Sequence, residues 1–392
     1  MSLFTTIVHH PRKLWIRRAL FQVHLWVGVL LSLYVVVISL SGSILVFQDE
    51  IRLASIQHPS LDREQLPPLS SVVTQAHDRF PSAKLTYVGF PQKHAPWWTL
   101  YLTKENGRPD LAYADATTGS PLVQRGRLFI DFVLDLHVYL LAGRTGFVVN
   151  CIAGAGLLLL AVTGMILWWP GIKLWKRALT VKLQRGWKRT NYDLHNVIGM
   201  ATLAIVSWWG ITAIYFLLPA QVSAVVDTIS PLEGMKAPVP HTPAASKEVT
   251  PIDTILAGLP AAERTRIGGV SLSEKPGSAV TIYVDRQESG DFSHRDILTF
   301  DSHTGKLLTV WHYGENHTLG DWIIWLMYPL HFGTVWGLGV KVLWALLGVC
   351  LALLSVTGLL MYWNRKLSKY FAASSLVQRR AQVSGMQLRS IR

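Results

Sequence analysis

The chain has 392 residues, of which 50% are hydrophobic, with 16 tryptophans and a mean hydropathy of +0.29. This is too apolar for an ordinary soluble protein of this length, so we expect an integral membrane protein. The net charge of +13 does not indicate nucleic-acid binding, because three short segments (1–20, 171–195 and 364–392) together carry +17 and the remainder carries −4.

Four stretches are long and apolar enough to cross a hydrocarbon core of about 30 Å. The positive-inside rule places the three basic segments, and therefore both termini, in the cytoplasm. The predicted order is N-terminus 1–19, first span 20–47, outside domain 48–127, interfacial segment 128–146, second span 147–170, cytoplasmic loop 171–195, third span 196–218, outside domain 219–321, interfacial segment 322–339, fourth span 340–363 and cytoplasmic tail 364–392.

Each of the two long outside segments has the pattern of a small α+β domain. Alternating apolar residues predict strands at 97–103 and 279–285, and helical patterns precede them at 70–80 and 250–259. Asp-x-x-x-Gly follows in both segments and suits a hairpin turn, in which the Asp side chain bonds the backbone and Gly takes a positive φ. These turns are Asp115 to Gly119 and Asp301 to Gly305.

The two halves of the chain repeat the same spacings. His24 precedes Ser41-Gly42 by 17 residues and His195 precedes Thr212-Ala213 by 17. His137 precedes Thr163-Gly164 by 26 residues and His331 precedes Thr357-Gly358 by 26. We therefore predict a tandem, parallel repeat whose unit is helix, outside domain, helix.

The four repeated histidines are candidate ligands, because an ionisable side chain in or beside a membrane span is costly and is functional by default. The alternative for any one of them is a purely structural histidine whose imidazole is hydrogen-bonded to a carbonyl. Helix length places His24 and His195 near the inner boundary of the membrane, and His137 and His331 at or above the outer boundary. The sequence therefore predicts two pairs, one at each face.

Haem fits each pair better than zinc. A structural zinc needs four protein ligands, whereas haem needs two axial ligands and an apolar slot. Gly28 and Gly199, each four residues after its histidine, would leave room for a porphyrin on the same helix face. Two imidazoles would fill the axial positions and favour electron transfer, and the other ring nitrogen should donate to an acceptor. The two cysteines exclude covalent CxxCH attachment and a four-cysteine cluster.

With these residues in view, the chain resembles the PepSY-associated transmembrane family of bacterial inner-membrane proteins, and within it the FoxB-type ferric-siderophore reductases. The motifs are HLWVG, DLHVYLLAGRTG with VTGMILWWP, DLHNVIG, and PLHFGTVWGLGVK with VTGLLMYW. The resemblance implies four spans, periplasmic PepSY domains, two non-covalent b-type haems with bis-His ligation by His24, His137, His195 and His331, and release of iron as Fe(II) from periplasmic ferric siderophore.

No general acid or nucleophile is required, and no GxGxxG fingerprint accompanies a cytoplasmic strand, so the expected electron donor is a quinol or a separate reductase. Candidate substrate contacts are Arg125, Arg127, Arg144, Trp311, His312 and His317, each of which also fits an ordinary solvated loop. Two alternatives stay open at this point. One is a PepSY-type binding or regulatory protein without redox activity, and the other is a transporter, although the repeat is parallel and no acidic residue lies inside a span.

Overall fold

The computed structural model describes residues 15–56, 65–105, 107–122, 128–238, 249–272, 279–286, 293–334 and 336–368. These residues form two compact units, each built from separate segments of the chain. The first, here called the helical unit, draws on the described residues of 15–43, 151–214 and 342–368. The second, the sheet unit, draws on Ile44–Asn150 and Tyr215–Lys341. Both halves of the sequence therefore contribute to both units.

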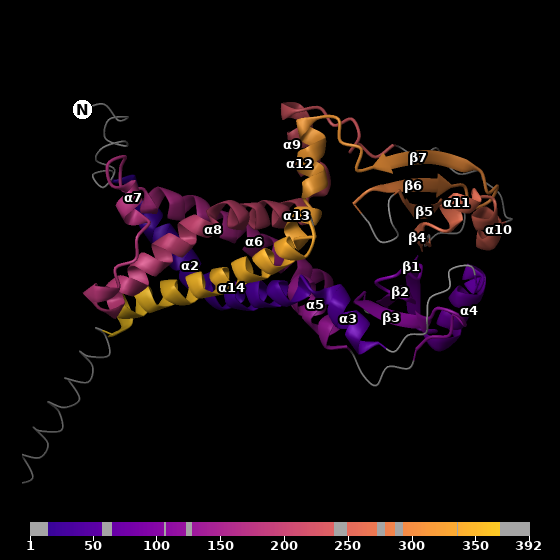
Figure 1. The fold of residues 1–392 in the computed structure, drawn as a ribbon, viewed down its shortest axis with the longest axis horizontal. Coiled ribbons are helices and arrows are strands. Elements are labelled where there is room, and N and C mark those ends of the chain that lie inside the picture. Colours follow the sequence, from indigo (N-terminus) through magenta and orange to yellow (C-terminus); the bar gives the residue numbers. More distant parts are fainter. Residues whose placement is uncertain are drawn as a thin grey trace, which may run out of the picture. The chain divides into compact units, whose positions relative to one another are not determined.

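Among the described residues, four helices are long and apolar enough to cross a membrane, which agrees with the predicted number of spans. They are α2 (Ile16–Leu45), α6 (Gly143–Trp168), α8 (Trp187–Leu217) and α14 (Leu338–Tyr362), and they run side by side in Figure 1. The third begins nine residues before the predicted span at 196, because the polar turns before the apolar run are helical as well. Hydropathy marks the apolar length of a helix and not its full extent.

Small residues allow the long helices to approach closely. Gly154 of α6 lies against Ala213 of α8, and Gly348 of α14 lies against Ser43. The Ser43 hydroxyl also donates to the Ala345 carbonyl at 2.9 Å. Such contacts replace the hydrophobic driving force that is missing between helices in lipid. Side chains at the centre of the bundle are Val35, Ala161, Val206 and Leu351.

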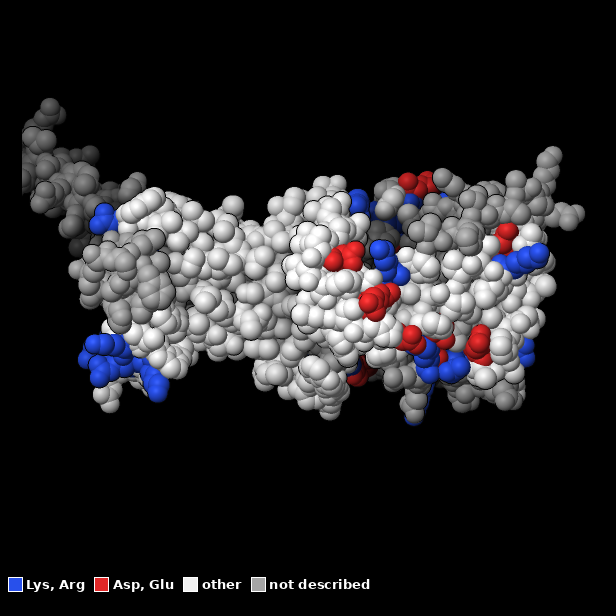
Figure 2. Space-filling model, turned by 90° about the horizontal axis from the view of Figure 1, so that it is seen from above, with Lys and Arg blue, Asp and Glu red and all other residues white. Residues whose placement is uncertain are grey.

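Charged side chains are confined to one end of these helices on the face drawn in Figure 2. Along the length of the helices the surface is almost entirely uncharged, and Lys and Arg gather at the end where α7 (Trp175–Ala178), η3 (Leu183–Arg185) and the π-helical turn η4 (Trp363–Leu367) lie. This distribution suits a segment surrounded by hydrocarbon with a basic aqueous end.

The sheet unit contains one antiparallel sheet of seven strands in the order β3-β2-β1-β4-β5-β6-β7. The first outside segment supplies β1 (Ala83–Gly89), β2 (Trp97–Lys104) and β3 (Pro109–Asp115). The second supplies β4 (Ile267–Ser271), β5 (Val280–Asp285), β6 (Arg295–Phe300) and β7 (Leu307–Tyr313). The expectation of two separate α+β domains is therefore corrected. Strands β1 and β4 pair, with Val88 opposite Val270, so neither segment leaves that edge open.

The predicted helices and turns of these segments are confirmed. Helices α4 (Leu69–Arg79) and α10 (Ile252–Ala257) pack on the sheet through Val72, Ala76 and Ile255, while α11 (Ala261–Arg264) leads into β4. Asp115 accepts backbone N–H bonds from residues 117 and 118, and Asp301 does the same from residues 303 and 304. Gly119 and Gly305 have φ values of 71° and 67°, which glycine adopts without strain.

The sheet unit also contains short helices, which lie along the chain between the strands and the long helices. They are α3 (Gln48–Ser55), α5 (Phe129–Tyr139), α9 (Pro219–Ile229), α12 (Leu319–Leu326) and α13 (Pro329–Phe332). Leu140 and Leu141 after α5, and Gly333 after α13, take positive φ, so each of the predicted interfacial segments contains a helix that ends within it. Their depth in a membrane stays a prediction.

Candidate functional site

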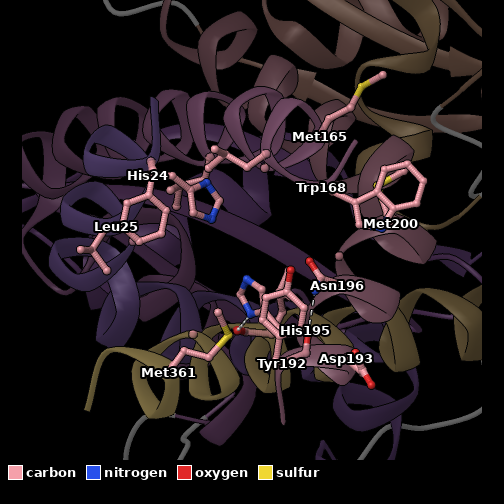
Figure 3. A pocket seen from close by; sticks show the side chains of 18 of the residues that line it. His24, Leu25, Met165, Trp168, Tyr192, Asp193, His195, Asn196, Met200 and Met361 are labelled. Atoms are coloured by element: carbon pink, nitrogen blue, oxygen red, sulfur yellow. Dashed lines mark hydrogen bonds between the residues drawn. The ribbon is translucent and has the colours of Figure 1, made fainter. Parts of the chain in front are cut away.

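His24 and His195 face one another in the helical unit. His24 comes from α2 and His195 from α8, and their ring centroids are 6.5 Å apart with the ring planes at 88°. Figure 3 shows both rings at the same cavity. The structure thus brings together the two histidines that the sequence pairs, from opposite halves of the chain.

One nitrogen of each ring is held by a threonine on a third and a fourth helix. His24 Nδ1 lies 2.9 Å from Thr163 Oγ1 of α6. His195 Nδ1 lies 3.0 Å from Thr357 Oγ1 and 3.1 Å from the Leu354 carbonyl of α14. Because Nδ1 is occupied in both rings, Nε2 is the nitrogen left for a ligand in the cavity.

The residue after each threonine leaves space for the imidazole. A Cβ atom at Gly164 would stand 3.2 Å from His24 Cε1, and one at Gly358 would stand 3.3 Å from His195 Cε1. Both distances are tighter than ordinary side-chain contacts. In each Thr-Gly pair, the threonine therefore contacts Nδ1 of the imidazole and the glycine lets the ring lie against the helix backbone.

A cavity of about 1380 Å³ surrounds the two rings. This exceeds the range of about 300–1,000 Å³ that small-ligand pockets usually have. Gly28 and Gly199 line it as predicted, one helical turn from their histidines. At one end its walls are apolar, with Val35, Val206 and Leu351.

The other end of the cavity is basic. Its single acidic side chain among the described lining residues, Asp193, is 4% exposed and is bound by Arg189 at 2.9 Å and by the backbone N–H of Lys182 at 3.2 Å. The Nε1–H of Trp168, also in the wall, has no hydrogen-bond partner among the described residues. The Lys and Arg residues that line this end are Arg17, Arg18, Arg177, Lys182, Lys188, Arg189 and Arg365.

These features fit haem. Imidazole nitrogens bind a first-row metal at about 2 Å, so two rings on opposite sides of one ion have centroids roughly 6 Å apart. The observed 6.5 Å matches this spacing. The cavity is apolar at one end and basic at the other, which matches the apolar ring and the two carboxylates of haem. At the basic end these carboxylates could accept hydrogen bonds from Lys and Arg side chains and from the unpartnered Trp168 Nε1–H.

The second predicted pair, His137 and His331, lies in the sheet unit. His137 is in the last turn of α5, where Asn150 Nδ2 donates to its carbonyl at 2.7 Å. His331 is in α13, and burial together with the nearby charge of His137 lowers the pKa of His331 to about 3. The ring is therefore neutral at physiological pH, which is the form that ligates metals. Aromatic rings surround it, with Phe216 at 5.0 Å between centroids.

The candidate substrate contacts are spread over the sheet unit. Trp311 Nε1 donates to the Gly234 carbonyl at 2.8 Å, and His312 Nδ1 lies 2.7 Å from Asp296. His317 binds Asp321 through its backbone N–H, and the exposed Arg144 stacks on Phe147. Arg125 and Arg127 lie outside the described residues.

Sequence reasoning missed the role of the Thr-Gly pairs. The equal spacing of 26 residues ties them to His137 and His331, whereas the structure sets them against His24 and His195. The signal was present in the matching stretches LAVTG at 160–164 and LSVTG at 354–358. Which histidine a distant helix contacts depends on packing, which spacing along one chain segment does not report.

Four long apolar helices around a histidine-lined cavity define a membrane protein with a cofactor-sized site. The chain belongs to the family described as PepSY-associated TM region, whose model matches residues 21–365. It is also 27% identical over 282 residues to an uncharacterized protein of Pseudomonas aeruginosa, covering 64% of this chain and 68% of that protein.

Proposed function

We propose that this protein is a di-haem membrane reductase that passes electrons across the bacterial inner membrane to a ferric siderophore, from which iron leaves as Fe(II). The observation that carries the proposal is the placement of His24 and His195, whose centroids are 6.5 Å apart on either side of a large cavity. Haem, when bound, supplies reversible one-electron transfer at its iron.

The residues of the helical unit would hold the first haem. His24 and His195 would be its axial ligands, Gly28 and Gly199 would leave room for the ring, and the basic end of the cavity would receive its carboxylates. With both histidines on the iron, substrate would not reach the metal, so the bound haem would supply electron transfer and not oxygen binding.

A second haem is proposed between His137 and His331. The equivalent positions of His137 and His331 in the last turns of α5 and α13, and the aromatic ring of Phe216 beside His331, support this pairing. We also propose that the chain is a tandem repeat. Equivalent Thr-Gly pairs on α6 and α14 contact the two histidines of the helical unit, which supports this.

The direction of transfer is proposed from charge. By the positive-inside rule, the basic segments favour termini in the cytoplasm, and the sheet unit would then lie outside, in the periplasm. A siderophore holds Fe(III) much more tightly than Fe(II), so one electron loosens the complex and no acid, base or nucleophile is needed. The absence of a dinucleotide fingerprint in the sequence favours a quinol or a separate reductase as electron donor.

An absorbance difference spectrum tests the proposal directly. Protein expressed with ample haem supply should show a Soret band, two haems per chain and reduction by dithionite. Anaerobic addition of ferric siderophores to the reduced protein should re-oxidise it, with Fe(II) trapped by a chromogenic chelator. A colourless protein would contradict the proposal and favour a binding or regulatory role. Reduced haem that no ferric chelate re-oxidises would contradict the proposed substrate.

A further inference from the structure

The two Leu-x-Val-Thr-Gly stretches, 160–164 and 354–358, each present a threonine hydroxyl to one imidazole, and the second also presents the Leu354 carbonyl. We infer that Thr163 and Thr357 are positioning residues that fix His24 and His195 in the Nδ1–H tautomer and hold the reduction potential of the bound haem low. The inference rests on the proposed function for its second part. Its first part concerns the protein without cofactor.

The argument is strongest at His195. Two oxygens face Nδ1, the Leu354 carbonyl at 3.1 Å and Thr357 Oγ1 at 3.0 Å. A carbonyl oxygen can only accept. The Thr357 hydroxyl is also 2.8 Å from the same Leu354 carbonyl, to which it donates its single proton. Both oxygens are therefore acceptors, and Nδ1 must carry the hydrogen.

His24 has an equivalent environment. The Thr163 hydroxyl donates to the Leu159 carbonyl at 2.7 Å, which leaves its oxygen to accept from His24 Nδ1 at 2.9 Å. With hydrogen on Nδ1, the lone pair of Nε2 points away from the threonine and is available to a metal.

Hydrogen bonding from the non-ligating nitrogen raises the basicity of a metal-bound imidazole. A more basic imidazole stabilises Fe(III) more than Fe(II), so the threonines lower the potential at which the haem accepts an electron. Glycines 164 and 358 complete the arrangement, since a side chain there would press the ring off its acceptors. A low potential is what reduction of a tightly held Fe(III) requires.

The tautomer is tested on protein without haem. Nitrogen-15 NMR of the histidine-labelled full chain in detergent, with His24→Ala and His195→Ala to assign the signals, should show both rings as Nδ1–H with Nε2 unprotonated. Thr163→Val and Thr357→Val should each shift the Nδ1 signal of the facing histidine and speed exchange of its proton. Nε2–H tautomers, or signals unmoved by the valines, would overturn the inference even if haem is never found.

The effect on the cofactor is measured by potentiometric titration. Loss of an outer-shell partner typically costs 10–100-fold in metal affinity. A tenfold loss of Fe(III) affinity alone raises a one-electron potential by 59 mV. We expect such an upward shift for Thr163→Val and for Thr357→Val, and near wild-type values for Thr→Ser at either position.

The matched control is Thr212→Val. The Thr212 hydroxyl also donates within its own helix, to the Trp209 carbonyl at 2.9 Å, but Thr212 lies 17 residues beyond His195 on α8, about 25 Å along the helix. This variant should leave the potential unchanged. An equal shift in Thr212→Val, or a potential in Thr163→Val that equals the wild-type value while the haem is retained, would overturn the role assigned to the threonines.

Discussion

Gly164 of α6 lies against the imidazole of His24, so closely that a Cβ atom on this glycine would stand 3.2 Å from Cε1 of the ring. Gly358 and His195 have the same relationship at 3.3 Å. The position of each ring thus depends on the absence of a side chain on a neighbouring helix.

Gly164→Val should lower the occupancy of the inner haem at least several-fold. The added methyl groups would push the ring of His24 away from Thr163 and toward the cavity, where it must align with His195. The haem-to-protein ratio, measured by pyridine haemochrome, checks this. Gly339→Val is the control, because no heavy atom lies within 4 Å of a Cβ there. Full occupancy in Gly164→Val would show that the close approach does not matter.

If the proposed function holds, His24→Ala should reduce the haem content from two to about one per chain, and His195→Ala should have the same effect, because the two rings are proposed to hold one haem. The remaining haem should keep the spectrum and potential of the outer site. Quantitative haem analysis with redox titration measures both. If His24→Ala and His195→Ala removed different haems, the pairing proposed here would be wrong.

Asp321 should make the stability of the sheet unit depend on pH in the acid range. Burial alone would raise the pKa of this carboxyl, but backbone N–H bonds from Met235, His317, Gly234 and Glu233 lower it to about 2. A depressed folded-state pKa adds stability above the unfolded value of 3.8, and that stability is lost as the pH falls from about 4 to about 2. The shift corresponds to about 2 kcal/mol at neutral pH.

Asp321→Asn should therefore unfold more easily at pH 7 and differ less from wild type near pH 2. Denaturant unfolding followed by tryptophan fluorescence at several pH values measures the difference. Asp78→Asn, at an exposed position of α4, is the control and should change little. A constant difference between Asp321→Asn and wild type across this pH range would contradict the linkage.

Arg52→Met should destabilise the sheet unit by about 3 kcal/mol, the typical cost of removing one partner of a buried ion pair. Asp131 is 7% exposed, lies 3.3 Å from the Arg52 guanidinium and accepts the Tyr113 hydroxyl at 2.9 Å. Thermal unfolding measures the loss. Arg79→Met, on the surface of α4, should cost less than about 0.5 kcal/mol. A similar loss of stability in both variants would show that the ion pair between Arg52 and Asp131 contributes no more than an exposed arginine does.

The sequence by itself determined the number of spans, the turns and the histidine pair. Four apolar runs exceed the length that a bilayer requires, and Asp115 with Gly119, like Asp301 with Gly305, specify their turns locally. His24 and His195 could be paired because helix geometry converts residue number into depth. Each of these properties depends on a short stretch of chain or on a fixed rise per residue.

The tertiary structure alone decided how separate segments meet. No local pattern indicated that β1 and β4 pair to join two outside segments into one sheet, since an antiparallel edge accepts any strand of suitable register. In the same way, the spacing associated Thr163 with His137, whereas packing of α6 against α2 set it beside His24. Contacts between distant helices depend on rotation about each helix axis, and that rotation is fixed only when the small residues of neighbouring helices fit together.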